Sequence, residues 1–253
     1  MLALKEADCG IAMASGSQAA SQVAKMVLLK SDFAAMPSIV GEGRRVINNI
    51  QRAATLFLVK NIFSLGLSLI TLFTVWPYPM EPIHLTMISA LTIGVPSFFL
   101  AMEPNYERIS GRFLLGVLRR ALPGGLTNIF VVLMAQAFMA VFDMAVSEIY
   151  PVCAAILSIV GLLVLFQTCK PFDKFRRIIW FAMAAALVGC FTLLPGLFEL
   201  HIGSWRTGLM MLVLILMTPT VFFALQRLCD WSDRRILGIR RRLRKRRKKK
   251  NPS

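Results

Sequence analysis

The amino-acid sequence predicts a mainly α-helical membrane protein: a bundle of six transmembrane helices preceded by a small, incomplete α/β segment. Three observations predict this class. The 253 residues are 57% hydrophobic and only 17% charged, which is too apolar for an ordinary soluble domain of this size. Six apolar runs are long enough to cross about 30 Å of hydrocarbon as helices. The first fifty residues differ from the rest, because short strand-like and helix-like stretches alternate there.

The N-terminal stretch is examined first. "LALKEAD" predicts a short helix, "GIAMA" a strand, "SGSQAASQVAKM" a helix with a serine cap, and "MVLL" a second strand. Alternating strands and helices favour a parallel sheet, but two strands are too few to enclose a core. We therefore expect residues 1–35 to be part of a larger α/β domain. Residues 36–52 are expected to form a cytoplasmic stalk helix that leads into the first apolar run.

The six predicted spans fill residues 53–227. They are approximately Ala53–Trp76, Ile83–Met102, Leu122–Phe142, Tyr150–Gln167, Ile178–Phe198 and Gly208–Leu225. Basic residues occur before the first span and in alternate connections: Arg44, Arg45 and Arg52, then Arg108, Arg112, Arg119 and Arg120, then Lys170, Lys174, Arg176 and Arg177. The other three connections contain only Arg206. Because cytoplasmic loops hold the excess of Lys and Arg, this alternation predicts a multi-pass plasma-membrane protein with both termini in the cytoplasm.

The strong positive charge is confined to the C-terminal tail, residues 228–253. Twelve of the Lys and Arg residues lie between Arg234 and Lys250, so the remaining residues carry only +4 of the formal +16. Such a tail beside a membrane span is expected to bind anionic lipid, at about 1 kcal/mol per charge near the surface. A basic run of this kind binds any polyanion in a salt-sensitive way, so we expect no specific nucleic-acid partner.

The first predicted span contains polar residues at membrane depth. A lysine there costs about 2.5–3.5 kcal/mol on insertion scales, so Lys60 marks a functional site, an interface anchor or an ion pair with an acid elsewhere. Asn61, Ser64 and Ser68 follow at i, i+3 and i+7, and so share one helix face. This polar stripe predicts that the face lines a polar path.

The second predicted span has a matching feature. Ser89 and Thr92 lie three residues apart, and Pro96 follows four residues after Thr92. Proline has no N–H, so the carbonyl of Thr92 loses its helical partner. Freed carbonyls are tolerated inside a membrane where they line a cavity or coordinate an ion. A single Ser or Thr hydroxyl in such a helix usually serves packing, so it is the alignment with Pro96 that favours an ion path.

These residues carry a resemblance to a known family. "LALKEADCGIAMASGSQAASQVAKMVLL" and "GEGRRVINNIQRAATLFLVKN" resemble the end of the HAD-like phosphorylation domain and the start of the fifth transmembrane helix of type II P-type cation ATPases, in particular bacterial calcium-type pumps. "EPIHLTMISALTIGVPSFFLAMEPN" is similar to their sixth helix. The resemblance implies that residues 1–35 end a phosphorylation domain and that the six spans correspond to helices five to ten.

The resemblance also implies a function and a site. Asn61, Ser64, Ser89 and Thr92 match cation-ligand positions of the family, with Lys60, Ser68 and Pro96 along the transport path. The family's carboxylates on these helices correspond here to Ser64 and Ile93, so a divalent ion would bind weakly unless another helix supplied a charge. We expect the transported ion to be Ca²⁺ or another metal cation.

The catalytic part of the family has no counterpart in residues 1–253. ATP and Mg²⁺ serve the complete pump, but the DKTGT, TGES and TGDGVND sequences that handle them are not found here. We expect this chain alone to be non-catalytic, as a truncated product, the result of a misassigned start, or one part of a split pump whose partner is the N-terminal half. The alternative is a non-enzymatic six-span membrane scaffold or regulatory protein.

Overall fold

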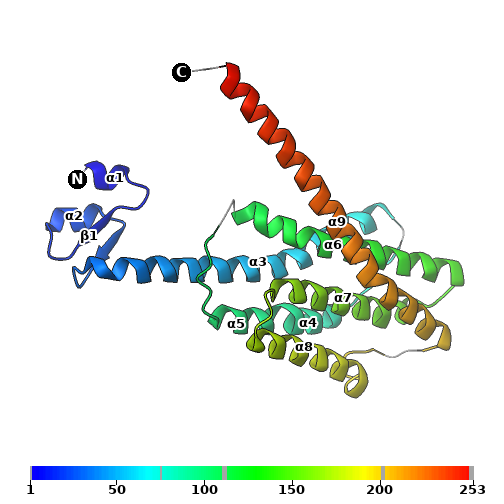
Figure 1. Cartoon of the computed structure of the whole chain (residues 1–253). Coiled ribbons are helices and arrows are strands. Elements are labelled where there is room, and N and C mark those ends of the chain that lie inside the picture. Colours follow the sequence, from blue (N-terminus) through cyan, green and yellow to red (C-terminus); the bar gives the residue numbers. More distant parts are fainter. Residues whose placement is uncertain (1, 75, 110–112, 201–202, 251–253) are drawn as a thin grey trace. The chain divides into compact units, whose positions relative to one another are not determined.

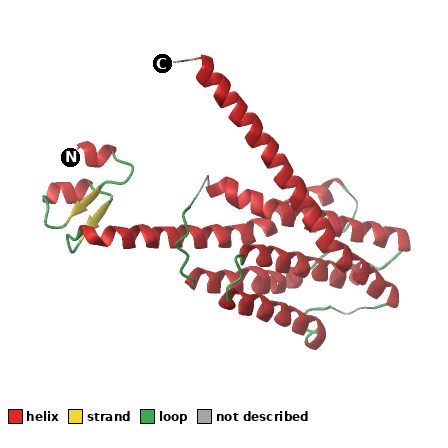
Figure 2. Ribbon diagram, in the orientation of Figure 1, coloured by secondary structure: helices red, strands yellow, loops and turns green. Residues whose placement is uncertain are grey.

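The computed structural model describes residues 2–74, 76–109, 113–200 and 203–250, and most of them are helical (Figures 1 and 2). The chain divides into two compact units. The first holds residues 1–48 and 104–109, and the second holds residues 49–103 and 110–253. The division after Asn48 falls within the predicted stalk segment, 36–52.

The first unit contains the predicted α/β elements. They are α1 (Leu2–Glu6), β1 (Ile11–Met13), α2 (Gln18–Val23), β2 (Met26–Leu28) and the 3₁₀ turn η1 (Phe33–Ala35). The two strands pair in parallel, with Ile11 opposite Met26. Ser17 caps α2 by accepting a hydrogen bond from the Ala20 N–H at 3.2 Å. The local predictions are confirmed, and the sheet has two strands among the described residues.

Helix α3 (Met36–Phe73) follows and contains both the predicted stalk and the first predicted span. The remaining helices of the second unit are α4 (Pro82–Ser89), the π-helical turn η2 (Ala90–Gly94), α5 (Val95–Met102), α6 (Phe113–Phe142), α7 (Val146–Thr168), α8 (Lys174–Leu193) and α9 (Trp205–Lys250). The α4–η2–α5 segment is the second predicted span.

The described residues contain six helical segments that are long and apolar enough to cross a membrane. This confirms the predicted number of spans and a multi-pass membrane protein. Two predicted boundaries are wrong. Helix α6 begins at Phe113, so Arg119 and Arg120 lie within a helix rather than in a loop. Helix α8 ends at Leu193, not Phe198, because Leu194 precedes a proline and leaves the helical conformation. Arg112 lies outside the described residues.

Helix α7 is at the centre of the second unit and packs against α4, α6, α8, α9 and η2. Its residues from Val152 to Leu157 are buried on every side, as expected of a helix that is apolar all round. In contrast, α8 and α9 leave most of their apolar side chains exposed in the chain as described. The side chains of most basic residues in the predicted tail lie outside the described ones.

Candidate cation site

The second span is interrupted at mid-length by a π-helical turn, η2, one residue before Pro96. The Val95 N–H reaches back five residues to the Ala90 carbonyl, and Pro96 is buried in the first turn of α5. Proline removes the N–H that would bond the Thr92 carbonyl, and the wider turn accommodates the change. The predicted disturbance opposite Thr92 is therefore present as a π-bulge, a feature found frequently at functional sites.

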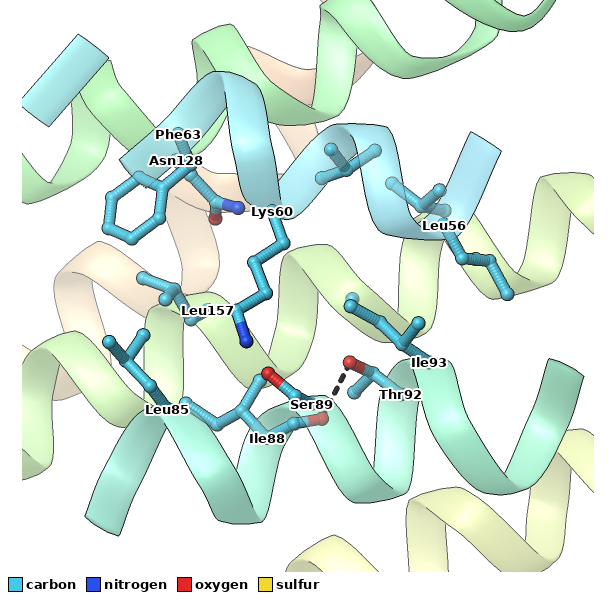
Figure 3. A pocket seen from close by; sticks show the side chains of 13 residues that line it. Leu56, Lys60, Phe63, Leu85, Ile88, Ser89, Thr92, Ile93, Asn128 and Leu157 are labelled. Atoms are coloured by element: carbon cyan, nitrogen blue, oxygen red, sulfur yellow. Dashed lines mark hydrogen bonds between the residues drawn. The ribbon is translucent and has the colours of Figure 1, made fainter. Parts of the chain in front are cut away.

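A cavity of about 40 Å³ lies beside this bulge, between α3, α4, η2, α6 and α7. That volume is enough for a water molecule or a small dehydrated ion. Most of its wall is apolar. Its polar lining residues are Lys60 from α3, Ser89 and Thr92 from the interrupted span, and Asn128 from α6 (Figure 3).

Thr92 is held tightly in this wall. Its side chain is 2% exposed, and its hydroxyl donates to the Ile88 carbonyl at 2.7 Å (Figure 3). Because the hydroxyl proton is used there, the oxygen lone pairs are left to accept from, or coordinate, another group. Gly161 of α7 makes room for the side chain: a Cβ at Gly161 would lie 2.7 Å from the Thr92 Cγ2 atom.

Lys60 reaches from α3 towards the interrupted span, and its ammonium group points towards Ser89 (Figure 3). The residues that line this cavity include no carboxylate. Nor do the described residues contain a group of three or more His, Cys, Asp and Glu side chains that could hold a metal ion. The cavity therefore combines one tethered positive charge with neutral oxygen groups.

The predicted site residues separate into two sets. Lys60, Ser89 and Thr92 come together at the cavity. Asn61 and Ser68 do not, because both lie on an exposed face of α3.

Ser64 is partly buried on α3 and hydrogen-bonds the phenol of Tyr78 in the following loop. Partial burial raises the pKa of Tyr78 above its usual value, and the Ser64 bond offsets part of that rise. Ser64 is therefore engaged with a loop residue and does not line the cavity.

Asn128 is a cavity residue that the sequence reasoning missed. It is 4% exposed, and its Oδ1 atom has no hydrogen-bond partner. A signal was present, because an asparagine in the apolar run of the third span breaks the same rule as Asn61. That rule was applied only to the first two spans.

A second polar cluster lies where α5 ends, and the sequence reasoning named its members without linking them. The Glu103 carboxylate receives Arg52 Nη1 of α3 at 2.9 Å and Arg176 Nε of α8 at 2.8 Å. The exposed fractions of the three side chains are 11%, 7% and 5%. Arg176 also donates to the Pro171 carbonyl at 2.6 Å. One carboxylate thus joins three membrane helices through two buried guanidinium groups.

Cys169, in the loop between α7 and α8, lies beside this cluster and is fully buried. Burial raises the pKa of its thiol to about 11, although the nearby Arg176 and Arg52 charges act in the opposite direction. The thiol is therefore neutral at physiological pH and unreactive.

Comparison with known proteins gives consistent relatives, although no family model matches the chain. Over 227 residues, 84% of the chain, it is 37% identical to the probable cation-transporting ATPase exp7 of Streptococcus pneumoniae. Over 136 residues, half of the chain, it is 45% identical to the calcium-transporting ATPase CtpE of Mycolicibacterium smegmatis. It is also 40% identical to the human potassium-transporting ATPase alpha chain 2 over 111 residues, 44% of its length.

The chain spans 29% of the pneumococcal relative, 17% of the mycobacterial one and 11% of the human one. These matches agree with the motifs of the first unit and with the six apolar helices. Together they place the chain among the P-type cation-transporting ATPases, as a homologue of part of their length.

Proposed function

We propose that the chain forms the ion-carrying membrane part of an ATP-driven cation pump, with Ca²⁺ as the first candidate ion. The names of the relatives support this choice: one is a probable cation-transporting ATPase, and another is a calcium-transporting ATPase. The potassium-transporting relative makes a monovalent cation the next candidate. We further propose that the pump lies in the plasma membrane with both ends of this chain in the cytoplasm.

The observation that carries the proposal is the cavity at the π-bulge. The hydroxyls of Ser89 and Thr92 and the carbonyl that Pro96 leaves without a partner are the oxygen donors that hard cations prefer. They lie on an interrupted membrane helix, which is where transporters coordinate ions. Apart from Lys60, the site is uncharged, so it would bind an ion more weakly than a site with carboxylates.

Lys60 acts in this proposal as a tethered cation. With no metal in the cavity, its ammonium supplies the positive charge that the neutral oxygens accept. Two unit charges about 4 Å apart repel by about 4 kcal/mol at an effective dielectric constant of 20. Entry of a metal ion therefore drives the Lys60 ammonium out of the cavity, and its return favours release of the ion.

Asn61, Ser64 and Ser68 enter the proposal at a different point. Their stripe lies along α3, where Asn61 and Ser68 are exposed in the chain as described. We assign this face to contact with a further helix of the complete pump, which would bring an additional oxygen or carboxylate to Asn61. The stripe and the cavity would then be two parts of one ion path.

ATP and Mg²⁺ are assigned to other parts of the pump. Residues 1–253 contain none of the DKTGT, TGES and TGDGVND sequences, and no side chain described here fits a phosphoryl-transfer role. The proposal therefore predicts that the isolated chain binds a cation but does not hydrolyse ATP.

Both claims are tested on the purified chain in lipid nanodiscs. We expect ⁴⁵Ca²⁺ to bind, and Thr92→Val to weaken binding at least about tenfold, because one oxygen facing a charged ligand is lost. The matched control is Thr192→Val on α8, whose hydroxyl makes the same bond to the carbonyl four residues earlier, at 2.8 Å from Val188. Absence of binding for Ca²⁺, Mg²⁺, K⁺ and Na⁺ would contradict the proposed site, and vanadate-sensitive ATP hydrolysis would contradict the non-catalytic role.

A further inference from the structure

Asn128 is a buried amide whose position the packing of α6 does not require. Other buried polar groups of the same helix have a hydrogen-bond partner for their donor: the Thr127 hydroxyl donates to the Pro123 carbonyl at 2.6 Å, and the Gln136 amide donates to the Pro77 carbonyl at 2.9 Å. Asn128 has no printed bond of either kind, and its Oδ1 atom is enclosed without a partner. Burying a polar atom without a partner is unfavourable, so such a group points to an additional ligand.

The surrounding helices hold this amide in place. Helix α6 carries Gly124 and Gly125 one turn before Asn128, and these residues let α3 approach closely. A Cβ at Gly125 would lie 2.5 Å from the Ile62 Cγ2 atom, and one at Gly124 would lie 3.2 Å from Val59. The Asn128 side chain therefore forms part of the same cavity wall as Lys60, Ser89 and Thr92 (Figure 3).

We propose that Asn128 is a cation ligand of this cavity, contributed by α6. Its Oδ1 atom joins the Ser89 and Thr92 oxygens as a third neutral donor for a hard metal cation, and without the metal it faces the ammonium of Lys60. An amide oxygen suits this role because it carries a strong dipole and accepts without a proton of its own. This inference rests on the proposed function, because it assigns a further residue to the same cavity.

The test is an Asn128→Leu variant of the chain in nanodiscs, measured in two ways. In cation-free buffer, its melting temperature is expected to rise, because an unpartnered polar group is replaced by an apolar one of similar size. In the same preparation, ⁴⁵Ca²⁺ affinity is expected to fall at least about tenfold. A ligand residue predicts this combination of greater stability and weaker binding.

Gln136→Leu is the matched control on the same helix. Gln136 is equally buried and its Oε1 atom also lacks a partner, but it does not line the cavity and its N–H is bonded to Pro77. We expect this variant to melt at a lower temperature and to bind ⁴⁵Ca²⁺ as the unmodified chain does.

The outcomes separate the two levels of the account. If the unmodified chain binds ⁴⁵Ca²⁺ and Asn128→Leu binds it equally well, the assignment of Asn128 is wrong while the proposed function stands. An Asn128→Leu variant that melts lower or does not fold would show a structural role and also overturn the assignment. If the unmodified chain binds none of the four cations, the proposed function fails, and the assignment of Asn128 fails with it.

Discussion

Replacing Glu103 by glutamine tests the structural role of the buried charge cluster. The substitution keeps the size of the side chain and removes its negative charge. The carboxylate accepts from Arg52 at 2.9 Å and Arg176 at 2.8 Å, and all three side chains are nearly buried. Glutamine would leave two buried guanidinium groups without a counter-charge.

The expected loss follows from these contacts. Removing one partner of a buried ion pair typically destabilises a protein by about 3–5 kcal/mol, because the remaining charge stays desolvated. For a chain of this size that corresponds to a fall in melting temperature of roughly 6–20 °C. Adding Arg176→Met to Glu103→Gln is expected to recover part of the loss, since it removes one of the unpaired charges.

The assay is thermal unfolding of the chain in nanodiscs, followed by tryptophan fluorescence. Glu42→Gln is the control, because Glu42 pairs with Arg45 in an exposed position where such a pair contributes at most about 1 kcal/mol. If Glu103→Gln and Glu42→Gln lowered the melting temperature equally, the reasoning about the cluster would be refuted.

Three further predictions concern other parts of the chain. Gly161→Ala is expected to destabilise by about 1–3 kcal/mol and to weaken ⁴⁵Ca²⁺ binding, because its Cβ would press on Thr92, whereas Gly189→Ala meets open space and should be neutral or stabilising in the same melting assay. The pKa of Cys169 is raised to about 11, so the stability it contributes is complete below about pH 8.5 and lost as the pH rises towards 11; a Cys169→Ser variant should lose that part of the alkaline slope, and an unchanged slope would contradict it. A peptide of residues 234–253 should bind vesicles with anionic lipid and be released by high salt, and equal binding to neutral vesicles would contradict a lipid-binding tail.

The sequence was sufficient to predict the local elements and the number of spans. The Ser17 cap, the paired strands and the apolar runs are signals contained within a few residues, so each could be recognised without knowing the packing. Pro96 likewise announced a disturbed turn, because the missing N–H is a property of the residue itself. The π-helical form of that turn depends on neighbouring helices and was not predictable.

The contacts between helices were beyond sequence reasoning. Arg52 and Arg176 were interpreted as loop charges that set topology, and only the fold brings both to Glu103. Periodicity grouped Asn61 with Ser64 and Ser68, but it could not show that Lys60, one residue earlier, is the residue that faces the cavity. Hydropathy treats such neighbours alike, although adjacent residues on a helix point about 100° apart.

The most direct test of the cation cavity is a crystal of the chain soaked with Sr²⁺, a heavier analogue of Ca²⁺, and measured for anomalous scattering. The account predicts a peak within about 2.6 Å of the Ser89, Thr92 and Asn128 oxygens, with the Lys60 ammonium displaced from the position in Figure 3. A cavity filled by acyl chain, or a peak elsewhere with Lys60 unmoved, would contradict it.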